Sequence, residues 1–337
     1  MPYRCSIYGL GVVANRPIPG VPSAKTASDD IRISFGSRPA WLHEVSEAQI
    51  ETSYIADYTD ECGSPVLRVF RLLDGQYYKF CYADGTEFVV DHAGTEIWAD
   101  WVEPLTLEDT TTYLLGPIMG FVMLLRGVVC LHASAIAIET RAIALLGPAG
   151  SGKSTTAAAF SQRGFSILAE DVVTLDDRGD QFLVRPAYPC IRLWPASVKA
   201  LYGAESSLPK LTPNWDKCYL DLTERPEQFQ RESLPLAGVY VLGERRNDPR
   251  APFIEPLDRA EAMMSLVANT YATKLMDKQM RAREFELLTR VLGSIPLRRV
   301  TPHADPARIP ELCDSILADL KLEHGFARMN ADRLCHV

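Results

Sequence analysis

The chain has 337 residues, 47% of which are hydrophobic, and its formal net charge is −8. A chain of this size is predicted to form one large domain or two ordinary ones. The acidic balance argues against nucleic-acid and anionic-membrane partners, which bind a basic face. The eight cysteines include no C-x-x-C pair, so they indicate neither a zinc site nor a redox pair. Scattered free thiols are typical of a reducing cytoplasm.

Neither a signal peptide nor a membrane helix is predicted. The N-terminal segment lacks the basic start, the apolar run and the small-residue cleavage site of a signal peptide. In the most apolar stretch, 113–138, Arg126 and His132 interrupt any run of the roughly 18 uncharged residues that a membrane helix needs. We therefore expect a soluble cytoplasmic protein. Its oligomeric state is left open, a homo-oligomer included.

Residues 1–105 are predicted to form a β-rich N-terminal domain. The segments 65–73, 76–83 and 86–93 are rich in Val, Tyr and Phe, which is typical of strands. Asp-Gly pairs at 74–75 and 84–85 separate them, and this dipeptide is a strong signal for a hairpin turn. Successive antiparallel hairpins are therefore expected here.

Residues 106–323 are predicted to form an α/β domain, and 324–337 a loosely ordered tail. A helix over 106–126 is followed by two buried strands, 128–138 and 141–147, then by a helix that stops at Gly164 and by a strand over 165–177. Strand, glycine-containing loop, helix and strand form the core of a nucleotide-binding domain. The later segments are expected to be a strand at 185–194, a helix at 195–203, an irregular region at 210–232, a strand at 237–244, helices within 258–292, a strand at 297–302 and a closing helix from Asp305.

The segment between the two buried strands and their helix carries the strongest functional signal. Its sequence, GPAGSGKST, satisfies the P-loop pattern G-x-x-x-x-G-K-[ST]. Glycines let the backbone wrap a phosphate, the lysine neutralises the β- and γ-phosphates, and the serine hydroxyl is a hard ligand for Mg²⁺. The alternative, a chance match in a turn, does not explain the strand before the loop and the helix after it. ATP and Mg²⁺ are therefore the expected ligands, and the expected nucleotide-binding residues are Gly147, Pro148, Ala149, Gly150, Ser151, Gly152, Lys153, Ser154 and Thr155.

Four further residues are catalytic candidates. Glu170 and Asp171 follow the P-loop helix after one short strand, so their carboxylates should reach the γ-phosphate. One would hold Mg²⁺ together with Ser154 and the other would accept the proton of the attacking hydroxyl, and which does which is left open. His132 stands in an apolar strand and Arg192 in a later one. The alternatives are structural: exposed acids, a core histidine and a surface arginine.

The residues 131–177 resemble the C-terminal catalytic domain of HPr kinase/phosphorylase. The resemblance lies in LHASAIAI, GPAGSGKS, the helix end QRG and LAEDVV. It implies an α/β fold with a P-loop HPr-kinase-like catalytic domain, in which His132 is the family's histidine and Asp171 its proton acceptor. Glu170 replaces the first Asp of the family's acidic pair, and the later Arg-Gly-x-Gly segment is absent.

The layout of the whole chain is similar to HPr-kinase-like proteins of peptide natural-product gene clusters, including lasso-peptide kinases. The similar segments are the opening strand with Tyr8-Gly9-Leu10, TYLLGPIMGFVMLLRG and YPCIRLWPASVKALYG. The similarity implies a P-loop serine kinase that phosphorylates a small precursor peptide.

Three functions remain in competition at this stage. The first is a kinase acting on a serine of a peptide or small protein, the second a small-metabolite P-loop kinase, and the third a non-catalytic ATP-sensing module. Metabolite kinases usually begin with the P-loop strand, whereas here the His132 strand and a β-rich region come first. We therefore expect the first.

Overall fold

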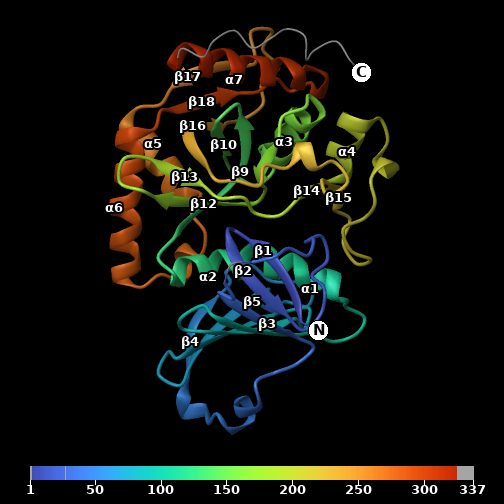
Figure 1. Ribbon diagram of the computed structural model, residues 1–337, viewed down its shortest axis with the longest axis vertical. Helices are drawn as coiled ribbons and strands as arrows, with labels where there is room; N and C mark the ends of the chain where they lie inside the picture. The colour runs from blue at the N-terminus through green and yellow to red at the C-terminus, as the bar shows by residue number, and fades with distance from the viewer. Residues whose placement is uncertain (1, 27, 325–337) are drawn as a thin grey trace. The chain divides into compact units, whose positions relative to one another are not determined.

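The computed structural model describes residues 2–26 and 28–324, so the expected tail, apart from His324, lies outside the described residues (Figure 1). The protein is mixed α/β with two large multi-stranded sheets. It divides into two compact units, each with one of these sheets. Unit 1 comprises Met1–Val128, Thr212–Trp215 and Tyr271–Arg281, and unit 2 comprises Val129–Leu211, Asp216–Thr270 and Ala282–Val337. Among the helices described, none has both the length and the hydropathy needed to cross a bilayer.

Unit 1 is built on an eight-stranded sheet in the order β1-β2-β3-β8-β7-β6-β5-β4. The β2–β3 and β3–β8 pairs are parallel and the others antiparallel. Both hairpins expected at the Asp-Gly pairs are confirmed, and Asp74 and Gly75 have the positive φ that such a turn needs. The strands are β1 (Tyr3–Ile7), β2 (Leu10–Ala14), β3 (Ile31–Phe35), β4 (Ile50–Ile55), β5 (Leu67–Leu72), β6 (Tyr77–Tyr82), β7 (Glu87–Asp91) and β8 (Glu96–Asp100).

The helical segment after this sheet belongs to unit 1. It consists of α1 (Leu107–Tyr113), the π-helical turn η3 (Leu114–Ile118) and α2 (Met119–Leu125). The π-helical turn contains Pro117, which has no N–H to donate to the helix. Phe121 makes edge contacts with Tyr78 and Phe80 of the sheet, with ring centroids 4.9 and 5.1 Å away. The boundary between the units therefore lies after Val128 rather than at residue 105, because the helix covers the sheet.

Unit 2 contains the second sheet, in the order β10-β9-β12-β13-β16-β18-β17. β10 also pairs in parallel with β16, so the strands from β10 to β16 close into a ring. Two long strands make this closure, since β9 and β16 each change partner along their length. The strands are β9 (Val129–Ile138), β10 (Arg141–Leu146), β11 (Ile167–Ala169), which pairs with β9, β12 (Val172–Asp177), β13 (Phe182–Val184), β16 (Leu234–Leu242), β17 (Phe253–Pro256) and β18 (Leu297–Thr301).

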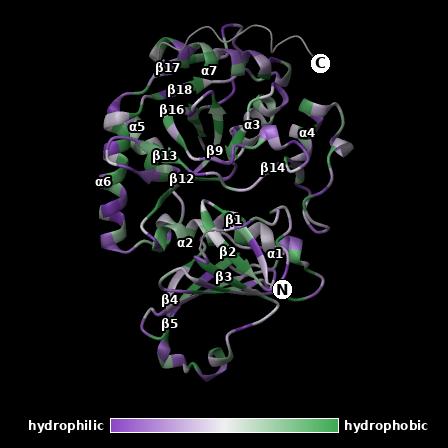
Figure 2. Cartoon of the chain, viewed as in Figure 1, coloured by the Kyte–Doolittle hydropathy of each residue, from purple (hydrophilic) through white to green (hydrophobic). Residues whose placement is uncertain are grey.

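Helices surround this sheet, and a separate ribbon of β14 (Cys190–Leu193) and β15 (Cys218–Asp221) lies against α3. β15 falls in the region that the sequence predicts to be irregular, so that prediction is wrong there. α3 buries Ala157, Ala158 and Phe160, and its small side chains allow close approach to β9. In Figure 2 the central strands of unit 2 are hydrophobic, whereas α6 is largely hydrophilic. The helices of unit 2 are α3 (Lys153–Gln162), α4 (Pro195–Tyr202), α5 (Arg259–Ala268), α6 (Lys278–Ser294), whose first turn belongs to unit 1, and α7 (Ile309–His324), with short 3-10 turns η4 (Glu205–Ser207), η5 (Pro226–Gln228) and η7 (Pro306–Arg308). The 3-10 turns η1 (Ala40–Glu44), η2 (Glu47–Gln49) and η6 (Thr273–Leu275) belong to unit 1.

The placement of α2 in unit 1 can be tested by its central aromatic residue. Phe121 is 1% exposed, so Phe121→Ala should lower the free energy of unfolding by about 3–5 kcal/mol. Phe285 of α6 is 56% exposed, and Phe285→Ala should change it by less than about 0.5 kcal/mol. Urea unfolding followed by circular dichroism measures both. A loss below about 1 kcal/mol for Phe121→Ala would contradict this packing.

Candidate active site

Strand β9 brings the parts of the site together. Its residues pair first with β12 and then with β10, and the change of partner falls between His132 and Ala133. His132 lies opposite Val172, the residue after Asp171, while Ala133 lies opposite Leu146, the residue before the P-loop. The acidic residues and the P-loop therefore flank one point of β9.

The loop between β10 and α3 has the backbone that the P-loop motif requires. Gly147 and Gly152 have φ angles of 144° and 107°, in a region that favours glycine. A Cβ on Gly147 would lie 2.7 Å from the carbonyl oxygen of Leu242, so no larger residue fits. Lys153 Nζ donates to the carbonyl oxygens of Gly147 at 2.8 Å and Pro148 at 3.2 Å. The lysine head thus lies inside the loop, beside the anion-binding N-terminus of α3.

The acidic pair stands at a break between β11 and β12. Consecutive residues of a regular strand point to opposite faces, so Glu170 and Asp171 would normally diverge. Here Asp171 has a φ of 71°, and the N–H of Val172 donates to the carbonyl oxygen of Glu170 at 3.0 Å. This is the γ-turn with positive φ, the rarer and strained form. It turns both carboxylates towards Arg192.

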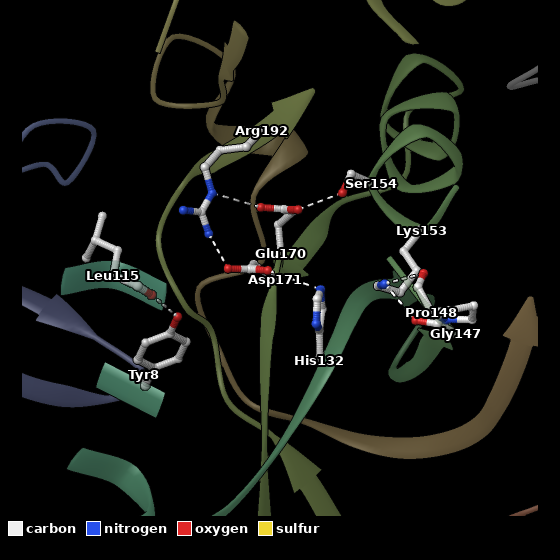
Figure 3. A network of polar contacts seen from close by, with 10 residues as sticks. All are labelled: Tyr8, Leu115, His132, Gly147, Pro148, Lys153, Ser154, Glu170, Asp171 and Arg192. Carbon is white, nitrogen blue, oxygen red and sulfur yellow. Dashed lines mark hydrogen bonds and ion pairs between the residues drawn. The ribbon is translucent and has the colours of Figure 1, made fainter. Parts of the chain in front are cut away.

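Each of the four carboxylate oxygens of this pair has its own partner (Figure 3). Ser154 Oγ donates to Glu170 Oε1 at 2.7 Å, and Arg192 Nε donates to Glu170 Oε2 at 3.3 Å. Arg192 Nη2 donates to Asp171 Oδ2 at 2.6 Å, and His132 Nε2 lies 3.4 Å from Asp171 Oδ1. Residues from β9, α3, the acidic turn and β14 therefore form one continuous polar chain.

The β14–β15 ribbon holds Arg192 in place. In this antiparallel pair Arg192 lies opposite Tyr219 and Leu193 opposite Cys218. The Arg192 side chain is only 8% exposed, and it lies against two carboxylates that neutralise its charge. The sequence leaves open whether Arg192 is a cation of the site or a surface arginine. In the structure it is buried against Glu170 and Asp171.

Burial governs the protonation of the site. It raises the pKa of Glu170, which the Arg192 guanidinium and the Ser154 hydrogen bond oppose. It lowers the pKa of the Lys153 ammonium, which the charges of Asp171 and Glu170 oppose. A buried carboxylate with a raised pKa gains most from a nearby cation, because the cation favours its charged form.

His132 is held from two sides. Its backbone N–H donates to the carbonyl oxygen of Asn269 at 2.7 Å, just past the end of α5. Burial lowers the pKa of its imidazole, while the Asp171 carboxylate raises it. The lowered pKa means that the imidazole is neutral at neutral pH, so it contacts Asp171 without forming a full ion pair.

The oxygen atoms around Ser154 fit a magnesium ion that arrives with a nucleotide. The Ser154 hydroxyl keeps its lone pairs free when it donates to Glu170. The hydroxyl oxygen of Ser154 and the carboxylate oxygen of Glu170 are both hard ligands. Within residues 2–26 and 28–324, no cluster of three or more His, Cys, Asp or Glu side chains forms a ready-made metal cage. Mg²⁺ is commonly held by one or two carboxylates plus substrate phosphates, and this site offers that set.

Other predicted residues of the P-loop face solvent or α4. Pro148, Ala149 and Gly150 are exposed at the tip of the loop, and Thr155 Oγ1 lies 2.8 Å from the Ser197 hydroxyl of α4.

Of two basic residues near the site, the sequence gives Lys217 only as a weaker candidate and does not single out Arg245. Lys217 precedes β15 and lies 5.1 Å over the ring of Trp194, and Arg245 donates to the carbonyl oxygen of Gly150 at 3.3 Å. Both contacts join residues far apart in the sequence, so no local pattern predicts them.

No protein-family model matches the chain, and no curated protein sequence does either. Among solved structures, the chain is similar to the Hpr(Ser) kinase/phosphatase from Coxiella burnetii, with a TM-score of 0.35 and 14% identity. The similar region covers 58% of this chain and 92% of that chain.

The electrostatics of His132 can be measured by NMR titration of the six histidines, with His132→Asn to assign its signal. We expect the pKa of His132 to lie below the ordinary value of about 6.5. Asp171→Asn should lower it further, because the carboxylate that favours the imidazolium is removed. Asp177→Asn, on β12, should leave it unchanged. A rise of the His132 pKa in Asp171→Asn would contradict this arrangement.

Proposed function

We propose that this protein is a kinase that transfers the γ-phosphoryl group of Mg-ATP to a serine hydroxyl. The observation that carries the proposal is the unbroken polar chain from His132 through Asp171, Arg192 and Glu170 to Ser154. It links the first turn of the P-loop helix to a carboxylate that can take a proton. Binding of a nucleotide alone would not need this second half of the chain.

The loop supplies the binding of the triphosphate. Its backbone N–H groups and the N-terminus of α3 would face the phosphates. Lys153 would exchange the carbonyl oxygens of Gly147 and Pro148 for the β- and γ-phosphate oxygens, which attract an ammonium more strongly. Ser154 and Glu170 would hold Mg²⁺, which supplies charge neutralisation between the two phosphates.

Asp171 is the best placed acid for the acceptor. In the transfer, the hydroxyl oxygen forms a bond to the γ-phosphorus and the bond to the β-bridging oxygen breaks, leaving its electron pair on ADP. The hydroxyl proton goes to Asp171. Arg192 orients Asp171 and Glu170 together, and neutral His132 fixes the other oxygen of Asp171. Glu170 is assigned to the metal rather than to the proton, because it is the acid that contacts Ser154.

The nature of the acceptor is the finer part of the proposal. A serine on a peptide or small protein, including a lasso-peptide precursor, is supported by the sequence resemblance of the P-loop region and of the chain's layout. The polar chain itself suits transfer to any hydroxyl that reaches Asp171. A hydroxylated small metabolite is therefore the alternative acceptor, and the experiment must compare it with a serine peptide.

The experiment that tests the function uses radiolabelled ATP, the full chain and two panels of acceptors. One panel contains serine peptides, including lasso-peptide precursors, and the other contains hydroxylated metabolites. Phosphoserine detected by mass spectrometry in a peptide supports the proposal. Label that appears only in a metabolite would assign the second function, and tight ATP binding with transfer to no acceptor would assign a sensing module.

Binding and chemistry should separate between two variants. Lys153 contacts the phosphates throughout, so Lys153→Ala should weaken ATP binding and transfer together. Asp171→Asn keeps the shape of the side chain but removes its basicity, so ATP affinity should change little. Transfer should fall about 10²–10⁴-fold, and the loose character of phosphoryl transfer favours the lower end.

Calorimetry for ATP and initial rates of transfer measure these effects. The matched control is Asp177→Asn, which neutralises an acid at the far end of β12 and should keep the wild-type rate. If Asp171→Asn transfers phosphate at the wild-type rate, the assignment of the base fails. If Glu170→Gln is the inactive variant with normal Mg²⁺ dependence, the two roles are exchanged.

The metal assignment predicts a pH dependence. Burial raises the pKa of Glu170, so this carboxyl must lose its proton before it binds Mg²⁺. The affinity for Mg²⁺ in the presence of ATP should therefore fall as the pH decreases, beginning at a higher pH than for an ordinary glutamate. Glu170→Gln should bind Mg²⁺ more weakly and lose this part of the pH dependence. Magnesium titrations of transfer between about pH 5 and pH 8 measure it, with exposed Glu224→Gln as control.

A further inference from the structure

A pocket opens beside the P-loop, on the side away from the acidic pair. The space that it encloses is about 670 Å³ when its open mouth is included. Ser151, Gly152 and Thr155 form its border with the phosphate loop. The other walls come from α4, from the segments after β16 and β18 and from the start of α7.

The topology of the sheet separates this pocket from the acids. β10 leads into the P-loop and has β9 on one edge and β16 on the other. The acidic turn adjoins β9, whereas Arg245 follows β16 and His303 follows β18. A triphosphate whose γ-phosphate faces the acids must extend the rest of the molecule elsewhere along the loop. The pocket lies where the nucleoside end of such a ligand would emerge.

The lining has the chemistry of a nucleoside site. Pro302 and Leu312 give apolar surface, and Arg245 gives a planar guanidinium that stacks on aromatic rings. Among the residues that the structure describes, Arg245 forms no ion pair, and its one hydrogen bond is to the carbonyl oxygen of Gly150. The backbone N–H of Asp305 donates to His303 Nδ1 at 2.9 Å. Because Nδ1 accepts this bond, Nε2 is the ring nitrogen that can donate to a ribose hydroxyl.

The described lining of the pocket carries no carboxylate or carboxamide side chain, and these are groups that commonly read the edge of a base. Adenine and guanine are usually told apart by hydrogen bonds to their edges, and a stacking guanidinium holds both equally. A pyrimidine offers a smaller face to the same stack, so stacking favours purines.

We infer that this pocket is the purine-nucleoside subsite of the phosphate donor, with Arg245 stacking on the base and His303 directed to the ribose. It accepts ATP and GTP alike and prefers both to UTP. The inference rests on the proposed function, because it takes the P-loop to bind a nucleoside triphosphate.

The test compares nucleotides with inorganic tripolyphosphate, which carries the phosphates and no nucleoside. Calorimetry on the full chain with Mg²⁺ should give ATP and GTP affinities within about threefold of each other and above those of UTP and tripolyphosphate. Arg245→Ala should weaken ATP about 5- to 30-fold and leave tripolyphosphate unchanged. His303→Ala should weaken ATP less. Arg246→Ala, the adjacent arginine outside the pocket lining, is the matched control and should change neither ligand.

Each contrary result has a definite meaning. Equal binding of ATP and tripolyphosphate by the wild type would overturn the nucleoside subsite. An equal loss for both ligands in Arg245→Ala would make Arg245 a phosphate ligand instead. GTP binding more than tenfold weaker than ATP, or UTP as tight as ATP, would overturn the inferred selectivity. If neither nucleotide nor tripolyphosphate binds, the proposed function itself fails, and that outcome is distinct from the others.

Discussion

The register of β9 is the constraint on which the site depends. His132 opposite Val172 and Ala133 opposite Leu146 place the acidic turn and the P-loop on adjacent residues of one strand. A shift by one residue would turn the His132 side chain to the other face. The buried alanines and isoleucines of β9 hold the register, because the same shift would exchange their faces as well.

This register brings charges into a buried place, where each needs a partner. Glu170 and Arg192 are both nearly inaccessible to solvent, and an isolated charge at such depth costs several kcal/mol. The four oxygens of the acidic pair meet that demand with Ser154, two nitrogens of Arg192 and His132. The site is therefore held in shape by its own charges. A ligand that brings a cation and phosphates exchanges some of these partners for others of like strength.

The sequence predicts single motifs of the fold and the site better than the tertiary contacts between them. The P-loop pattern is specific because few spacings satisfy it, and the hairpins at Asp74-Gly75 and Asp84-Gly85 follow from local turn chemistry. The placement of α2 with the N-terminal sheet depends on tertiary contacts of Phe121, which no local pattern encodes. β15 lies within 210–232, the region predicted to be irregular. It has only four residues, which is too short for the alternation of apolar and polar residues to indicate a strand. The role of Arg245 is not predictable from the sequence either, because only the folded chain brings it to the carbonyl oxygen of Gly150 in the P-loop.

The backbone of Asp171 shows why its contacts lie beyond sequence reasoning. Two adjacent acids in a strand are expected on opposite faces, and the pattern LAEDVV reads as one continuous strand. The γ-turn at Asp171 breaks that strand at a cost of about 1–3 kcal/mol, which aspartate bears better than most residues. What offsets the cost is the pair of contacts that the turn makes available, one to Arg192 and one to His132. Strain of this kind persists only where surrounding contacts fix it, and here they are contacts of the site itself.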